Sequence, residues 1–394
     1  MNNYILILNA GSSSLKFCVY HPPRDGNLDI VVRGQIEGIG SAAMLSAKDK
    51  EGQTLVSRQP YAQIKDAVDA IDALAGWLRS QFKEANIVGV GHRVVHGGTH
   101  YFLPTILTDE VVQNLRGLIP LAPLHQPYNL AAIDAVSNRL PGVPQVACFD
   151  TGFHRGHDPV ADLVPLPEHI RNQGVQKYGF HGLSYEYISS VIPEVAPKTN
   201  GGRIIVAHLG SGASLCAIAN GKSVDTTMGF TAMDGLCMGT RPGALDPGVV
   251  LYMFQSLGLT VSEVENILYK RSGLIGISGT SNDMRNLLEQ EGGKESLAVD
   301  YFVFRAAKEI GALTAVLKGL DALVFTAGIG ENSPVIRQRI CDASAWLGIE
   351  LDEQANMSNK KNRISTSDSK VGVFVIPTNE ELMIARHLSK ALDL

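Results

Sequence analysis

The chain has 394 residues, 45% of them hydrophobic and 19% charged, and a formal net charge of −5. This length favours two domains, because a single hydrophobic core rarely serves so long a chain. The excess of acidic residues argues against nucleic-acid binding, which depends on clustered Lys and Arg. The sequence shows no signal peptide and no run of 18 or more apolar residues. We therefore expect a cytoplasmic protein with neither a nucleic acid nor a membrane as a partner.

Aliphatic runs and amphipathic periodicity divide the first part of the chain into strands and helices. The predicted strands are Tyr4–Leu8, Leu15–Tyr20, Asp29–Ile36, Thr54–Arg58, Ile87–Val95 and Gln145–Phe149. A helix is predicted from about Gln63 to Phe82, where apolar residues recur every three to four positions, and another near Tyr128–Arg139.

The second half repeats this order. Strands are predicted at Arg203–His208, Ser214–Ala219, Ala322–Thr326 and Val371–Ile376, and Asn220-Gly221 predicts a two-residue hairpin. Helices are predicted at Pro247–Leu257, Val261–Leu268, Leu297–Lys318 and at the end of the chain. Strands followed by alternating helices and strands, twice over, indicate two mixed α/β domains with a cleft between them.

Glycine-rich turns follow buried strands in both halves, in ILILNAGSSSLKF (5–17) and IIVAHLGSGASL (204–215). Gly11 and Gly210 are 210 − 11 = 199 residues apart, about half of the chain. Such a turn can present backbone N–H groups to an anion. Neither turn is a Walker A motif, and the first alone could equally be an ordinary hairpin. A third turn of this kind, AGIGENS after Thr326, favours phosphate binding.

Polar residues stand among glycines, prolines and aliphatics in the middle of the chain: Arg93, His125, Asp150, His181 and Arg241. Taken singly, such a histidine is usually a hydrogen-bonded structural residue, and such an arginine a salt-bridge partner. The presence of five such residues in similar surroundings indicates instead that these side chains are held rigidly in a cleft.

These segments together resemble the acetate and propionate kinase family, part of the superfamily of sugar kinases, actin and heat-shock chaperones. The resemblance rests on an ordered set of motifs: NAGSSSLKF, GHRVVHGG, APLH, FDTGFH, YGFHG, HLGSGAS, GKSVDTTMGFT, MGTRPGALDP, KRSGLIGISG, VFTAGIGENS and PTNEELMIAR. It implies two actin-like (ribonuclease H-like) domains of duplicated βββαβαβα type around an ATP cleft. Residues 1–151 plus 382–394 would form the N-terminal domain, and residues 152–381 the nucleotide-binding domain.

The resemblance implies a homodimeric enzyme that reversibly transfers the γ-phosphoryl group of ATP to acetate. A carboxylate is already ionised at pH 7, so the reaction needs no general base, but it needs donors and positive charge around the phosphoryl group. Its implied catalytic residues are Asp150, which would orient the nucleophile or the metal shell, His181 and Arg241. The implied substrate-binding residues are Arg93, Val95, Leu124, His125 and Phe180.

For the nucleotide, the resemblance implies a long list of contacts: Lys16, His208, Leu209, Gly210, Ser211, Gly212, Asp283, Met284, Arg285, Gly328, Ile329, Gly330 and Asn332. Mg²⁺, with Mn²⁺ as an alternative, would be held mainly by nucleotide oxygens and by Asn9 and Glu380. A structural alternative exists at Thr378-Asn379-Glu380-Glu381, which also opens a helix. A capping box there would pair Thr378 with Glu381 and leave Glu380 for the metal.

Four positions depart from the common family pattern: Ser211 for Asn, Thr99 for Glu, Ala232 for Pro and Gly152 for Ala. The smaller Ala232 could widen the acyl pocket by roughly one methylene. A propionate or butyrate kinase is therefore the alternative enzyme. A non-catalytic actin-like nucleotide switch is the alternative from another class, but it would need an additional peptide-binding or polymerising region.

Overall fold

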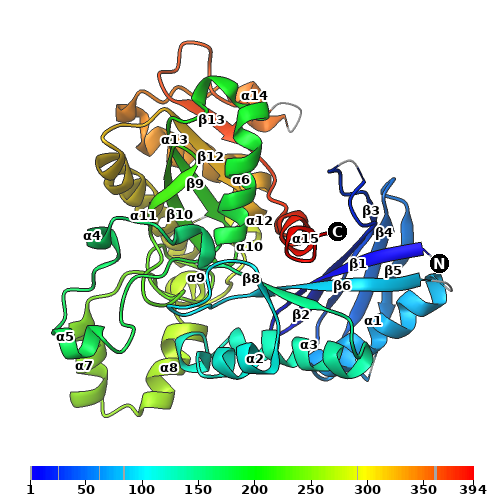
Figure 1. The fold of residues 1–394 in the computed structure, drawn as a ribbon. Helices are drawn as coiled ribbons and strands as arrows, with labels where there is room; N and C mark the ends of the chain where they lie inside the picture. Colours follow the sequence, from blue (N-terminus) through cyan, green and yellow to red (C-terminus); the bar gives the residue numbers. More distant parts are fainter. Residues whose placement is uncertain (1, 25, 62, 83–84, 291, 359–361) are drawn as a thin grey trace. The chain divides into compact units, whose positions relative to one another are not determined.

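The computed structural model describes residues 2–24, 26–61, 63–82, 85–290, 292–358 and 362–394. The chain folds into two compact units, each built on one β-sheet (Figure 1). The first unit contains the residues up to Gly152 together with Asn379–Leu394, and the second contains Phe153–Thr378. Both boundaries lie within a few residues of those implied by the family resemblance, and Glu380 belongs to the first unit.

The first unit has an eight-stranded sheet in the order β5-β4-β3-β2-β1-β6-β8-β7. Neighbouring strands from β1 to β5 are antiparallel, whereas β1, β6 and β8 run parallel to one another. The strands are β1 (Asn2–Ala10), β2 (Ser14–Tyr20), β3 (Ile30–Glu37), β4 (Met44–Asp49), β5 (Thr54–Pro60), β6 (Ala85–Val94), β7 (Thr105–Ile106) and β8 (Gln145–Phe149).

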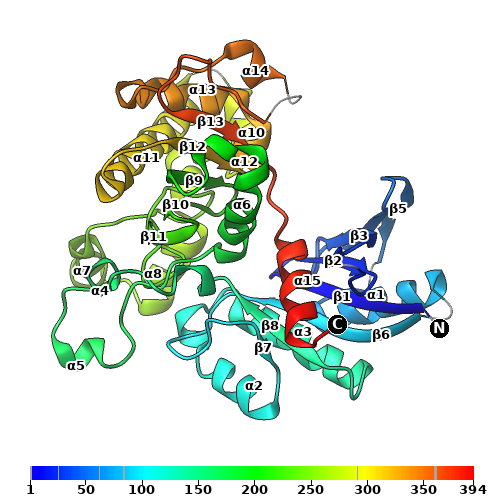
Figure 2. The ribbon, with the colours of Figure 1, turned by 45° about the horizontal axis from the view of Figure 1, so that its top comes forward.

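Helices cover the two faces of this sheet. Alternate strand residues such as Leu6 and Leu8 form one core with α1 (Ala67–Gln81) and α3 (Gln126–Arg139). On the other face, α15 (Glu380–Ala391) crosses β1, β6 and β8, as Figure 2 shows. A Cβ at Gly91 would lie 2.7 Å from Ile384 Cγ2, so this glycine allows α15 to approach the sheet closely. A further helix, α2 (Asp109–Arg116), packs on α3.

The second unit has a five-stranded sheet in the order β11-β10-β9-β12-β13. Its strands are β9 (Arg203–Leu209), β10 (Ala213–Ala219), β11 (Lys222–Thr226), β12 (Ala322–Thr326) and β13 (Gly372–Val375). Its helices are α4 (Pro159–Asp162), α5 (Glu168–Arg171), α6 (Gly182–Val195), α7 (Pro247–Gln255), α8 (Val261–Lys270), α9 (Gly273–Ser278), α10 (Met284–Leu288), α11 (Gly293–Leu317), α12 (Ala327–Asn332), α13 (Pro334–Ala343) and α14 (Glu353–Met357).

Five strands of the first sheet have the same topology as the five strands of the second. In the first, β3-β2-β1 are antiparallel neighbours and β1, β6 and β8 are parallel; in the second, β11-β10-β9 and then β9, β12 and β13 repeat this pattern. Residues 11–13 join β1 to β2, and residues 210–212 join β9 to β10. The duplicated α/β fold class predicted from the sequence is therefore confirmed. The hairpin at Asn220-Gly221 is confirmed too, since both residues have positive φ.

The prediction of local structure from the sequence was incomplete. Among the elements not predicted are β4 and α6, and the segment after Thr326, predicted as a turn, forms α12. The α6 segment GLSYEYISSVIPEV contains β-branched residues, serines and Pro193, all of which weaken helix propensity. Packing of its apolar face against the second sheet compensates, because Tyr185, Ile188 and Ile192 lie in the core of that unit.

Each unit contains one tryptophan. Trp77 on α1 is 7% exposed and its ring meets Phe17 edge-on, whereas Trp346 is 72% exposed. All five cysteines are buried thiols that form no disulfide bond. Among the described residues, no helix is both long and apolar enough to span a lipid bilayer.

Candidate active site

The first unit gathers three other predicted site residues around Arg93. The Arg93 guanidinium donates to the Asp150 carboxylate (Nε–Oδ1 2.9 Å, Nη2–Oδ2 2.5 Å) and, through Nη1, to Asn9 Oδ1 at 3.2 Å. Glu380 Oε2 lies 3.8 Å from Arg93 Nε. These contacts leave one hydrogen on each of Nη1 and Nη2 for another acceptor.

The fold explains why these residues meet. Asn9 and Arg93 lie near the carboxyl ends of the parallel strands β1 and β6, and Asp150 directly follows β8. Carboxyl ends of parallel strands share one edge of a sheet, which is where ligands bind in open α/β sheets. Glu380 joins them as the first residue of α15, which packs on the same strands.

The electrostatics of this group are those of a largely desolvated charge cluster. Burial raises the pKa of Glu380 to about 7, against the lowering effect of Arg93 and with a further rise from Asp150 and Glu381. Burial lowers the pKa of Arg93, but the carboxylates of Asp150 and Glu380 outweigh it and the net pKa is raised. The guanidinium therefore stays charged, while Glu380 titrates near neutral pH.

The donor set fits a hard divalent cation with few protein ligands. Asn9 Oδ1 and the Glu380 carboxylate, both in contact with Arg93, supply oxygen atoms of the kind Mg²⁺ prefers. Within the described ranges, no group of three or more His, Cys, Asp or Glu side chains could hold a metal. A cation here would need most of its ligands from a bound substrate and water.

The second unit places His181 and His208 together. Their rings stack with centroids 4.1 Å apart and planes 15° from parallel. Each Nδ1 is hydrogen-bonded to a serine hydroxyl at 2.8 Å, Ser214 for His181 and Ser184 for His208. His181 adopts a left-handed conformation (φ 58°) just before α6, a strained geometry for a residue with a Cβ. The two imidazoles are thus fixed in orientation.

Arg241 lies beside His181, and both border the turn at Gly212. A Cβ on Gly212 would be 2.8 Å from Arg241 Nη2 and 3.4 Å from His181 Nε2. Arg241 donates to the Ala232 carbonyl oxygen at 2.5 Å, and no carboxylate of the described residues forms an ion pair with it. Burial lowers the pKa of Arg241 to about 10, so it remains a cation at neutral pH. A desolvated cation without a counter-charge is suited to an anionic ligand.

A pocket of about 740 Å³ in the second unit collects most of the residues predicted to bind the nucleotide. Those that line it are Gly210, Ser211, Asp283, Met284, Arg285, Gly328, Ile329 and Asn332. Gly328 has no heavy atom within 4 Å of the position a Cβ would take, so the backbone there is open to a ligand. The pocket also has a wall at Ser333, Pro334 and Val335 that sequence reasoning missed.

The other predicted residues lie apart from this pocket. Lys16 belongs to the first unit, on β2, and Gly330 is buried within α12. Leu209 is fully buried at the end of β9. Among the predicted substrate contacts, Val95 is buried and Leu124 and His125 are half-buried in the first unit. Phe180 is 1% exposed within the second unit, where its carbonyl oxygen contacts His154 Nε2.

Comparison with known proteins agrees with the resemblance seen in the sequence. The model of the acetokinase family matches residues 4–386. The chain belongs to this family.

Acetate kinase from Nitrobacter hamburgensis is 52% identical over 99% of this chain and 96% of that protein. Acetate kinase from Rickettsia prowazekii is 43% identical over the full length of both. The crystal structure of Porphyromonas gingivalis acetate kinase is 35% identical with a TM-score of 0.85, covering 99% of this chain and 100% of that one. A propionate kinase from Francisella tularensis is 36% identical with a TM-score of 0.88, covering 98% and 99%.

Two features of this acetokinase-family chain correct or explain the sequence reading. The predicted capping box is wrong: Asn379 caps α15 through Leu382 N, and Thr378 Oγ1 donates to Ser184 Oγ at 2.8 Å. The departure from Ala at Gly152 is explained by sterics, since a Cβ there would lie 2.5 Å from the Phe102 carbonyl oxygen.

Proposed function

We propose that this chain is an acetate kinase, an ATP:acetate phosphotransferase that forms acetyl phosphate and ADP reversibly by direct in-line transfer. The observation that carries the proposal is the near-full-length match to acetate kinases, up to 52% identity over 99% of the chain. The cluster around Arg93 and the cluster of Arg241 and His181 support it, because each contains a desolvated guanidinium surrounded by polar groups. Transfer of a phosphoryl group between two anions requires such positive charge.

In this reaction, Arg93 binds the acetate carboxylate through the η hydrogens that Asp150 and Asn9 do not use. Asp150 is then a positioning residue, since its carboxylate fixes the plane of the guanidinium. Val95, Leu124, His125 and Phe180 are proposed to complete the acyl-binding residues. The acetate oxygen attacks without a general base because it is ionised at neutral pH.

Arg241 and His181 stabilise the charge that develops on the transferring phosphoryl group, with His208 supporting the ring of His181. The pocket lined by Ser211, Asp283 and Gly328 holds the nucleotide, whose phosphates approach the turn at Gly210–Gly212. Asn9 and Glu380 would hold a divalent cation, Mg²⁺ or Mn²⁺, which neutralises phosphate charge when bound.

A hydroxylamine trap tests the activity directly. Purified protein with ATP, Mg²⁺, acetate and hydroxylamine should give acetohydroxamate, and the Arg241→Ala variant should form it about 100-fold more slowly or worse. Failure to form acyl hydroxamate at any workable acetate concentration would refute the proposal. ATP hydrolysis independent of any carboxylate would instead favour the nucleotide switch.

A propionate or butyrate kinase remains the second candidate, supported by Ala232 and by the similarity to a propionate kinase of known structure. Comparing kcat/KM for acetate, propionate and butyrate separates the two. One methylene changes such a ratio by about 10 to 200-fold.

We further propose a cytoplasmic homodimer whose interface includes α7. This helix reads PGVVLYMFQ, yet none of its residues is buried within the chain, and Leu251 and Tyr252 are 55% and 56% exposed. A second copy would cover this apolar face. Light scattering should show that the wild type is a dimer and that the Leu251→Asp variant is a monomer. A monomeric wild type would exclude the proposed dimer.

A further inference from the structure

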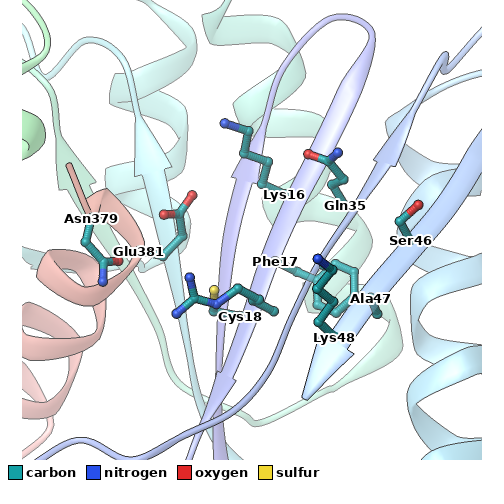
Figure 3. Close-up of a pocket in the computed structure, with 11 residues that line it drawn as sticks. Lys16, Phe17, Cys18, Gln35, Ser46, Ala47, Lys48, Asn379 and Glu381 are labelled. Atoms are coloured by element: carbon teal, nitrogen blue, oxygen red, sulfur yellow. The ribbon is translucent and has the colours of Figure 1, made fainter. Parts of the chain in front are cut away.

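A further pocket lies in the first unit, over β2, β3 and β4 beside the start of α15 (Figure 3). Its volume is about 340 Å³. Its polar lining comes from Lys16, Arg33, Gln35, Ser46, Lys48, Asn379 and Glu381. We call it the β2–β4 pocket. Of these residues, the sequence implied a ligand contact only for Lys16, and a helix-capping role for Glu381.

Strand register builds this lining as two cross-strand rows. Lys16 pairs with Gln35, which pairs with Ser46; Cys18 pairs with Arg33, which pairs with Lys48. Side chains two residues apart on a strand share a face, so all of these project from the same side of the sheet. The intervening Phe17 and Ala47 side chains enter the hydrophobic core on the opposite side.

The pocket is predominantly cationic. Lys16, Arg33 and Lys48 line it, and Glu381 is its one acidic lining residue among those described. In the same described part of the chain, none of these three cations forms an ion pair. Arg33 and Lys48 stand directly opposite each other on antiparallel strands, an arrangement that destabilises a sheet when the charges are alike. Conflicts of this kind with local stability are typical of functional sites.

The remaining lining residues support anion binding rather than redox or metal chemistry. Burial raises the pKa of the Cys18 thiol to about 12, so it stays protonated and is a poor nucleophile or metal ligand. Gln35, Ser46 and Asn379 add neutral groups that can donate hydrogen bonds to an oxyanion. Figure 3 shows Asn379 and Glu381 at one side of the pocket and Ser46 and Lys48 at the other.

We propose that the β2–β4 pocket binds a small oxyanion with two or more negative charges, such as a phosphate monoester or a dicarboxylate. Arg33 and Lys48 bind the anion from the adjacent strands β3 and β4, and Lys16 on β2 adds a third positive charge. Glu381 opposes binding and so limits the affinity. No lining residue of this site also lines the nucleotide pocket, whose lining residues all belong to the second unit.

Isothermal titration calorimetry on the full-length protein tests this site, with saturating Mg·ADP present to occupy the nucleotide pocket. Glycerol 3-phosphate and succinate are the two probes, and the one that binds identifies the anion class. The variant R33A/K48A should weaken binding by about tenfold or more, because two charge-assisted contacts are lost. Glu381→Gln should tighten it about two- to threefold, since a like charge is removed.

The control variant is K50A/K65A. Like R33A/K48A it removes two positive charges, but from exposed positions of the first unit outside the pocket. It should bind both probes like the wild type. R33A/K48A should also melt at the same or a higher temperature than the wild type without ligand, because the opposed cations are gone.

Two results would overturn the proposal. One is that the wild type binds neither probe at concentrations of about 10 mM, where a contact of only a few kcal/mol would still be detected. The other is that R33A/K48A and K50A/K65A bind a probe equally. The readout is binding in the presence of nucleotide, so neither result bears on the hydroxamate assay of the proposed kinase activity.

Discussion

The Arg93 guanidinium and the Asp150 carboxylate form a two-point contact, Nε–Oδ1 at 2.9 Å and Nη2–Oδ2 at 2.5 Å, with the Asp150 side chain 2% exposed. The pair joins the ends of two adjacent parallel strands, because Arg93 lies on β6 and Asp150 follows β8. It therefore fixes the guanidinium in the orientation that the acetate carboxylate would meet.

Asp150→Asn should lower both stability and activity. Removing one partner of a buried pair leaves the other charge poorly compensated, at a cost of about 2 to 4 kcal/mol in the free energy of unfolding. We expect kcat/KM for acetate to fall about 100-fold or more, because Arg93 loses its fixed orientation.

The matched control is Asp72→Asn. Asp72 contacts Arg139 at the same 2.5 Å, but the two side chains are 36% and 54% exposed. Urea unfolding should show a loss of no more than about 1 kcal/mol there, as for other exposed pairs. Equal losses in the two variants would contradict the role assigned to burial.

Glu380→Gln should change stability in a pH-dependent way. The pKa of Glu380 is raised by burial from 4.5 in the unfolded chain to about 7, so its contribution to stability is complete below pH 4.5 and is lost as pH rises toward 7. The free energy of unfolding of the glutamine variant, relative to that of the wild type, should therefore rise by about 1 to 3 kcal/mol as the pH is raised from 5 to 8. A stability difference that does not vary over this range would contradict the raised pKa.

Arg241→Ala should separate activity from stability. Its guanidinium is desolvated and forms no ion pair with a described carboxylate, so its removal should leave the free energy of unfolding within about 1 kcal/mol of the wild type, or raise it. We expect kcat to fall about 100-fold or more while the KM for ATP changes little. A near-normal kcat with a raised KM would contradict the role of Arg241 in stabilising the transition state. Lysine at this position should restore only part of the rate, since it lacks the planar fork.

Gly212→Ala should impair catalysis through sterics. The new Cβ would lie 2.8 Å from Arg241 Nη2, so the guanidinium must shift. We expect a loss of kcat of about tenfold or more, as small misplacements near reacting groups cause. The control Gly76→Ala places a Cβ in open space on the exposed side of α1 and should leave kcat unchanged while adding about 0.5 to 1 kcal/mol of stability. Equal kcat in the two variants would contradict the assigned contact.

The sequence predicted the duplicated strands well because each is a short aliphatic run bounded by turn residues, and Gln145–Phe149 and Ala322–Thr326 match the structure at both ends. It predicted α6 poorly because that helix depends on burial of Tyr185 and Ile188 rather than on its own propensity.

For the site, motif order identified the polar residues, but not their partners. The Arg93–Asp150 pair joins residues 57 positions apart, and the Asn379 cap replaces the box expected from Thr378 and Glu381. The β2–β4 pocket could not be read from the sequence at all, because Arg33 and Lys48 become neighbours only through strand register.

The placement of the two tryptophans gives the protein a built-in optical probe. Trp77 is enclosed in the core of the first unit, whereas Trp346 is already in water in the second. The red shift of tryptophan emission on denaturation therefore comes almost entirely from the first unit, while far-ultraviolet circular dichroism follows the helices of both. If the two signals change at the same urea concentration, the units unfold as one cooperative system; if they separate, the fluorescence curve gives the stability of the first unit alone.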